Sequence, residues 1–233
     1  MSRVLRSDLA FVADWIAPGS SVLDLGCGDG TLLAYLQEEK GCRCYGVEID
    51  PDKVLGCVRN DVNVIQQNLE EGLAMFGDQS FDTVVQLESL QAVRHTRQML
   101  AELRRVGRES IVTFPNFGFW ADRVAIARGR MPVTKSLPYQ WFDSPNLRFS
   151  TLNDFTDLAR ASGFAVLASL ALHEGRPVHW LPNLRGSLAV LRLRAQVADV
   201  GARRKSGSAL PGISGIIETP VPRYGRVAQG RDE

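Results

Sequence analysis

The stretch Ser21-Val-Leu-Asp-Leu-Gly-Cys-Gly-Asp-Gly30 decides how the rest of the chain folds. Its first half is a short apolar run with Pro18-Gly19 before it and glycines after it, which is typical of a fully buried parallel strand. Residues 31–40 carry apolar side chains at helical spacing and end in a basic turn followed by a glycine. Strand, glycine loop and helix together predict a nucleotide-type binding site in an α/β sheet.

The spacing of the glycines indicates the class of ligand. A dinucleotide fingerprint needs G-x-G-x-x-G, but Thr31 occupies the place of its third glycine. The glycines instead stand at 26, 28 and 30, with Asp24 two residues before the first. This D-x-G-x-G-x-G pattern resembles motif I of the class I S-adenosylmethionine-dependent methyltransferases. The resemblance implies that the loop holds the methionyl part of that cofactor and that Asp24 lies near its ammonium group.

An acidic residue at the end of the next predicted strand, 43–49, supports the same class. Glu48 stands at the carboxyl end of this strand, the edge where doubly wound sheets bind ligands. A carboxylate there can accept hydrogen bonds from both ribose hydroxyls, and the family places its motif II acid at this position. Asp50 is the rival, but a role as the cap of the next helix, with Pro51 in the first turn, explains it better.

The third predicted strand, 62–65, leads to the expected adenine contact. Related sequences commonly carry an acid near position 68 that pairs with the adenine amino group, whereas this chain has Asn68. The side-chain oxygen of Asn68 can accept the same hydrogen bond without a charge. The cofactor contacts that the resemblance implies are Asp24, Gly26, Cys27, Gly28, Gly30, Glu48, Ile49, Asn68, Leu69 and Gln86.

No catalytic residue is assigned from the sequence. The fourth predicted strand, 80–85, resembles the F-D-x-V-V element of the family but lacks the D-P-P-Y motif of enzymes that methylate exocyclic amines, which disfavours nucleic-acid bases as acceptors. Glu88 and His95 follow this strand and are candidate general bases. We favour the alternative in which Glu88 is an acid on a helix surface and His95 is a solvated loop histidine.

The segment 114–149 is expected to be an insertion after a fifth strand at 110–114. It holds eight of the eighteen aromatic residues of the chain and four of its prolines, without clean periodicity. Such a segment indicates a packed lid or a partner surface. A satellite hydrophobic cluster that fastens helices to the sheet is an equally weighted alternative. Trp120 and Trp141 are the partner-binding residues we expect, because aromatic anchors commonly dominate interfaces.

The remaining patterns complete an α/β, doubly wound, Rossmann-like sheet that is mostly parallel. A helix is expected over 96–106 and another after the capping box at Thr151, and strands at 164–172 and 187–193 close the sheet with an antiparallel last strand. The domain is expected to span 1–198. In residues 199–233, 12 of 35 residues are Gly, Pro or Ser, which predicts a disordered tail.

Composition excludes several classes of function. A net charge of +1 argues against a nucleic-acid surface, and no apolar run approaches the ~18 residues of a membrane span. The first residues lack the apolar core of a signal peptide, so we expect a cytoplasmic protein. The four cysteines show neither a disulfide framework nor metal-ligand spacing, and buried, reduced thiols are expected.

Several segments narrow the resemblance to the methionine biosynthesis protein MetW family. They are 24–29, 46–51, 90–93, 106–109, 113–118, 128–133, 137–139 and 144–146, within a match over roughly 3–194. Members of that family associate with and activate homoserine O-acyltransferase. The resemblance therefore implies a methyltransferase-like regulatory subunit that binds S-adenosylmethionine or S-adenosylhomocysteine. A catalytically active small-molecule methyltransferase is the alternative.

Overall fold

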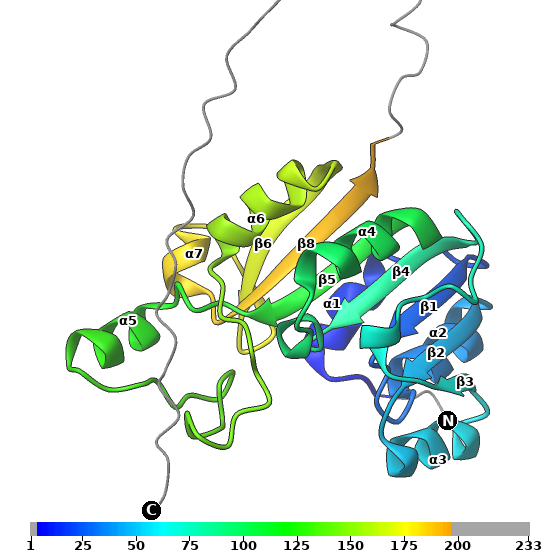
Figure 1. The fold of residues 1–233 in the computed structure, drawn as a ribbon, viewed down its shortest axis with the longest axis horizontal. Coiled ribbons are helices and arrows are strands. Elements are labelled where there is room, and N and C mark those ends of the chain that lie inside the picture. Colours follow the sequence, from blue (N-terminus) through cyan, green and yellow to red (C-terminus); the bar gives the residue numbers. More distant parts are fainter. Residues whose placement is uncertain (1–3, 197–233) are drawn as a thin grey trace, which may run out of the picture. The chain divides into compact units, whose positions relative to one another are not determined.

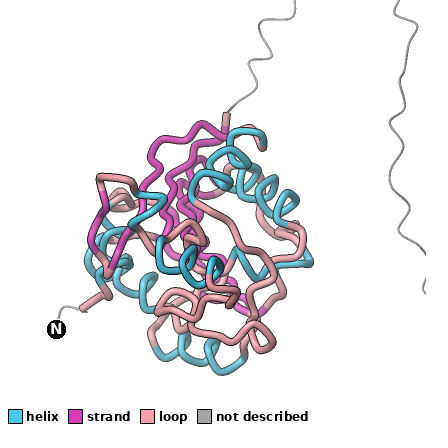
Figure 2. The backbone as a smooth tube through the Cα atoms, turned by 90° about the vertical axis from the view of Figure 1, so that its left-hand side faces the viewer, coloured by secondary structure: helices cyan, strands magenta, loops and turns pink. Residues whose placement is uncertain are grey.

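A computed structural model describes residues 4–196, which form one eight-stranded sheet with helices on both of its faces (Figures 1 and 2). The strands follow the spatial order β3-β2-β1-β4-β5-β8-β6-β7. Their bounds are Ser21–Leu25 (β1), Arg43–Glu48 (β2), Asn63–Gln66 (β3), Phe81–Leu87 (β4), Gly107–Pro115 (β5), Phe164–His173 (β6), Arg176–Val178 (β7) and Leu188–Ala195 (β8). The helices are Ser7–Asp14 (α1), Thr31–Lys40 (α2), Pro51–Arg59 (α3), Thr96–Val106 (α4), Trp120–Ala127 (α5), Leu152–Ala161 (α6) and Pro182–Arg185 (α7).

The sheet has the predicted topology. Strands β3, β2, β1, β4 and β5 are parallel neighbours, and β8 runs antiparallel between β5 and β6. The order reverses direction at β1, so the carboxyl ends of β1 and β4 flank a topological switch point, where open α/β sheets bind ligands. The doubly wound fold class is therefore confirmed. The short strand β7 and the helices α5 and α7 are additions that the sequence did not predict.

Side chains alternate between the two faces of the sheet along the central strands, and a hydrophobic core forms on each face. Along β1, Val22 faces one core, and Leu23 and Leu25 face the other, as the period of a strand requires. The first core includes Cys57 of α3 and apolar residues of α1 and α2, whereas the second is covered by α4 and α6. All four cysteines are buried and free, which confirms the prediction of buried thiols.

Two helix starts that the sequence predicted are present with their capping contacts. The Asp50 side chain accepts a hydrogen bond from the backbone N–H of Asp52, with Pro51 at the first helical position of α3. Thr151 Oγ1 accepts from the backbone N–H of Asp154 at the start of α6. Both caps use the local chemistry of the sequence, which explains why they were predictable.

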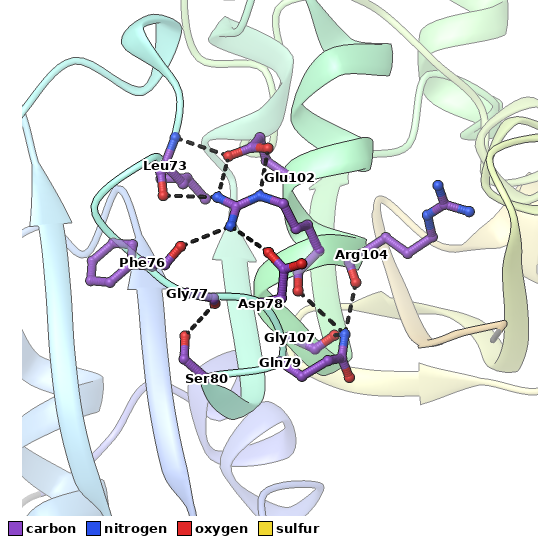
Figure 3. A network of polar contacts seen from close by, with 10 residues as sticks. Leu73, Phe76, Gly77, Asp78, Gln79, Ser80, Glu102, Arg104 and Gly107 are labelled. Atoms are coloured by element: carbon purple, nitrogen blue, oxygen red, sulfur yellow. Dashed lines mark hydrogen bonds and ion pairs between the residues drawn. The ribbon is translucent and has the colours of Figure 1, made fainter.

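Arg105 on α4 fastens the loop that leads into β4. Figure 3 shows this polar network with its labelled members, among them Leu73, Phe76, Asp78 and Glu102. Its guanidinium donates to the backbone oxygens of Leu73 and Phe76 at 2.9 and 2.8 Å and to the carboxylates of Asp78 and Glu102. Glu102 Oε2 also accepts from the backbone N–H of Leu73 at 3.1 Å. The network fixes part of the segment that connects the end of β3 to β4.

None of the helices in the described part of the chain is both long and apolar enough to cross a membrane. The expected tail at 199–233, and with it the expected boundary of the domain at 198, lies outside the described residues.

Replacing Arg105 by alanine should lower the free energy of unfolding by about 1–3 kcal/mol, because two backbone oxygens and two carboxylates lose a charged donor. Urea unfolding measures the change. The control is Arg97→Ala, which removes an exposed arginine from the same helix and should have a much smaller effect. Equal losses in the two variants would contradict this role of Arg105.

Candidate functional site

A cavity of about 750 Å³ opens at the carboxyl edge of the parallel strands. Each of four consecutive sheet neighbours contributes to its wall at or just after its carboxyl end: Asn68 and Leu69 after β3, Glu48 and Ile49 at β2, Gly26 after β1, and Glu88 and Ser89 after β4. The topology thus brings together five of the predicted cofactor contacts. An elongated ligand could extend along this edge from β3 to β4.

The glycine loop after β1 turns sharply where the sequence predicted it. Gly26, Gly28 and Gly30 have φ values of 80°, 59° and 76°, a region that favours glycine. A Cβ on Gly26 would lie 2.8 Å from the Cβ of Ser89, so this position also needs glycine because the segment that follows β4 is so close. A Cβ on Gly28 would meet nothing within 4 Å, so at this position the positive φ alone favours glycine.

Glu48 is buried and holds the glycine loop against the end of β2. One carboxylate oxygen accepts from the backbone N–H of Gly28 at 2.9 Å, and the other accepts from the N–H groups of Ile49 and Asp50 at 2.9 and 3.1 Å. Three of its roughly four acceptor positions are therefore used by the backbone. A ribose diol at this point would share or replace these contacts. The sequence predicted the carboxylate but not its structural role.

Asp24 is a buried carboxylate with an unsatisfied oxygen. Only 3% of the residue is exposed, and its Oδ1 has no hydrogen-bond partner among the described residues. Burial raises the pKa of Asp24 to about 7, and the nearby charge of Glu48 acts in the same direction. A cationic group bound beside the loop would satisfy this oxygen. The residues present therefore fit a ligand that carries an ammonium group.

Asn68 caps the short 3₁₀ helix Leu69–Glu71 and lines the cavity. Its Oδ1, the atom expected to face adenine, accepts from the backbone N–H of Glu70 at 3.0 Å. A second lone pair on this oxygen and the amide NH₂ group remain for a base.

The other predicted contacts are not among the described residues that line the cavity: Asp24, Cys27, Gly28, Gly30 and Gln86. Gln86 is completely buried, and neither its Oε1 nor its Nε2 has a partner among the described residues. The sequence ended this strand at Val85, but β4 continues to Leu87, so Gln86 lies inside the strand. Cys27 instead faces the neighbouring core, with its sulfur 3.7 Å from that of Cys57.

The insertion both packs on the domain and contributes to the cavity. Phe114 and Phe119 are buried, whereas Trp120 and Trp141 are 53% and 71% exposed. The cavity wall includes a set of insertion residues that the sequence did not assign to the site: Lys135, Ser136, Pro138, Tyr139, Pro145 and Asn146. Only long-range folding brings this set to the strand ends.

The two candidate bases have different environments. Glu88 lines the cavity with φ 48°, and burial raises the pKa of its carboxyl while Arg6 acts against that rise. His95 lies outside this wall, with its Nδ1 3.0 Å from Glu70 Oε2. The described residues contain no group of His, Cys, Asp and Glu that could hold a metal ion.

The sheet order, the glycine loop and the acidic end of β2 define a Rossmann-like protein of the class I methyltransferase type. The family profile described as methionine biosynthesis protein MetW matches residues 6–193. The chain belongs to this family.

Two relatives show the range of proteins that the chain is similar to, and the first of them carries the name of this family. The chain is 37% identical over 164 residues to the bifunctional methionine biosynthesis protein MetXA/MetW of Rhodopirellula baltica, a match that covers 66% of this chain and 26% of that relative. It is 28% identical over 156 residues to the 2-methyl-6-phytyl-1,4-hydroquinone methyltransferase of Synechocystis. This match covers 64% of this chain and 48% of that relative. The chain thus spans less than half the length of either relative.

Solved structures support the fold. A methyltransferase from Thermotoga maritima described as S-adenosylmethionine-dependent superposes with a TM-score of 0.60 at 20% identity, covering 82% of this chain and 88% of the other. A second methyltransferase structure, from Listeria monocytogenes, superposes with a TM-score of 0.62 at 14% identity. The match covers 82% of this chain and 99% of the other.

The buried Asp24 should make stability depend on pH. Its folded pKa is raised, so the unfolded chain loses this proton first, and the wild type loses stability as the pH rises from about 4 to about 7. Asp24→Asn removes that loss. Its unfolding free energy relative to the wild type should rise by on the order of 2–4 kcal/mol over this range.

Urea unfolding at a series of pH values measures the difference. Asp143→Asn, a change at an exposed aspartate, is the matched control and should give a constant difference. A constant difference for Asp24→Asn as well would show that Asp24 ionises normally in the folded protein.

Proposed function

We propose that the chain binds S-adenosylmethionine or S-adenosylhomocysteine in the cavity at the carboxyl edge of the sheet. The observation that carries this proposal is the order of polar groups along that edge: Asn68 after β3, Glu48 at β2, and the glycine loop with buried Asp24 at β1. Adenine, ribose and an amino-acid group follow one another in the same order along the ligand.

Each part of the ligand has a matching group in the chain. Asn68 and Leu69 would hold the adenine ring by a hydrogen bond and an apolar contact, and Glu48 would accept from the ribose hydroxyls. Asp24 would accept from the ammonium group, which would favour its ionised form. When bound, S-adenosylmethionine supplies a methyl group on a sulfonium. The similarity to methyltransferases described as S-adenosylmethionine-dependent supports this assignment.

We further propose that the chain acts in methionine biosynthesis as a subunit that associates with homoserine O-acyltransferase and activates it. The relative from Rhodopirellula baltica carries MetXA and MetW in a single name, and this chain covers only 26% of it. Two activities that are joined in one chain in one organism are good candidates to associate as separate chains in another. The resemblance to the MetW family implies the same partner.

The insertion offers a surface for such a partner. Trp141 and Phe142 are 71% and 65% exposed and lie edge to face, with ring centroids 5.6 Å apart. Large exposed aromatic side chains that cluster are typical of interaction sites. Because Tyr139 in the same loop lines the cavity, a ligand in the cavity would contact the segment that carries the partner surface.

Methyl transfer to a small molecule is the second candidate. The cavity reaches beyond the β1–β4 edge to Pro138, Tyr139 and Pro145, which gives room for an acceptor beside the cofactor. Transfer from a sulfonium depends mainly on alignment of the reactants, so a weak candidate base such as Glu88 does not exclude it.

Replacing Glu48 should weaken cofactor binding. Glu48→Ala removes charge-assisted hydrogen bonds to ribose worth about 1.5–3 kcal/mol, which corresponds to a ten- to hundredfold higher dissociation constant for S-adenosylhomocysteine by calorimetry. Glu48→Gln tests whether the charge matters when the shape is kept. The control is Asp50→Asn, because the amide oxygen retains the capping contact. A wild-type protein that shows no binding would refute the proposal itself.

Replacing Trp141 should weaken the partner complex. Trp141→Ala is expected to weaken binding to homoserine O-acyltransferase by at least about 1–2 kcal/mol, which is a dissociation constant about five- to thirtyfold higher, while leaving cofactor affinity unchanged. Trp180→Ala is the matched control, since Trp180 is 67% exposed but lies outside the insertion. S-Adenosylhomocysteine should change the affinity of the wild-type pair. Identical affinities with and without it would contradict coupling between the sites.

A further inference from the structure

We infer that Arg6, just before α1, binds the carboxylate of the amino-acid group of the ligand, an assignment that rests on the proposed function and deepens it. Arg6 lines the same cavity as Gly26 and Glu48, although more than forty residues separate it from Glu48 in sequence. Neither the glycine motif nor the strand pattern points to this arginine. Folding alone brings it to the site.

The position of Arg6 along the sheet edge selects the part of the ligand that it would meet. Its Nη2 lies 3.4 Å from Oε1 of Glu88, which follows β4, and 3.0 Å from Oδ2 of Asp8. Asn68 and Glu48 occupy the β3 and β2 end of the edge. With the nucleoside at that end, the amino-acid group would reach the β1–β4 end, where Arg6 stands.

The charges of the site require a cation at this point. Asp24, Glu48 and Glu88 are carboxylates in or beside the wall, so a ligand carboxylate would be repelled without a positive partner. The other cations among the described lining residues are less well placed. Lys135 is on the insertion and pairs with Glu174, and Lys53 is on α3, which follows β2.

The guanidinium of Arg6 retains unused donors for such a contact. Both of its ion pairs involve Nη2, so among the described residues neither Nη1 nor Nε has a hydrogen-bond partner. A guanidinium can present two parallel N–H groups to a carboxylate, which makes it better suited than a lysine. Asp8 and Glu88 would hold the side chain over the cavity while these donors face the ligand.

The test compares ligands that differ only in the amino-acid group. S-Adenosylhomocysteine carries both carboxylate and ammonium, its decarboxylated analogue keeps the ammonium, and 5′-methylthioadenosine lacks both groups. Calorimetry gives the dissociation constant of each for the wild type, Arg6→Gln, Arg6→Lys and Lys135→Gln. The last variant removes one positive charge from the same cavity and controls for general electrostatics.

We expect Arg6→Gln to weaken binding of S-adenosylhomocysteine about ten- to hundredfold and to change binding of the other two ligands by less than about twofold. Arg6→Lys should restore part of the loss, and Lys135→Gln should have little effect. The melting temperature should hardly change, because Arg6 is exposed.

Two results would overturn the assignment while leaving the proposed function intact. The first is an equal loss for all three ligands in Arg6→Gln, which would indicate a general effect on the site. The second is unchanged binding of S-adenosylhomocysteine in that variant. By contrast, a wild type that binds none of the three ligands would overturn the proposed function, and this assignment with it.

Discussion

The Glu48 carboxylate is the constraint on which the site depends. It accepts from backbone N–H groups at the ends of two neighbouring strands, one in the glycine loop after β1 and two at the start of the segment after β2. The contact requires the loop to pack directly on β2. Gly46 makes this packing feasible, because a Cβ there would lie only 2.5 Å from the Cys27 sulfur. A buried charge with three charge-assisted hydrogen bonds therefore sets the shape of the cavity before any ligand arrives.

Local signals explain what the sequence could predict. The glycine loop, the Asp50 cap and the Thr151 cap depend on residues within a few positions of one another, and all three form as expected. The sheet order followed from the resemblance to a known fold. Glu48 could be predicted because it ends a strand that the local sequence pattern already indicates.

Long-range contacts explain what the sequence could not predict. Arg6 and Lys135 line the cavity only because distant segments meet there, and no spacing in the chain marks them. Strand β4 continues to Leu87, beyond its predicted end at Val85, and this buries Gln86, which the sequence placed at the ligand edge. Helix α5 was missed because its sequence, Trp120–Ala127, has no side-chain cap to signal its start.

The insertion links the cavity to the exterior of the protein. One part of it, from Lys135 to Asn146, contributes to the cavity wall, while Trp141 in the same stretch points its ring to solvent. A ligand that changes the position of this stretch would change the surface available to a partner. Such coupling needs different ligand affinities for two arrangements of the loop, since equal affinities shift no equilibrium.

A crystal structure of the protein with S-adenosylhomocysteine tests the central claim most directly. The account predicts that the ribose hydroxyls lie within hydrogen-bond distance of the Glu48 carboxylate, with the adenine beside Asn68 and Leu69 and the amino-acid group over the glycine loop. A ligand bound with its ribose away from Glu48, or an empty cavity at saturating ligand, would contradict it.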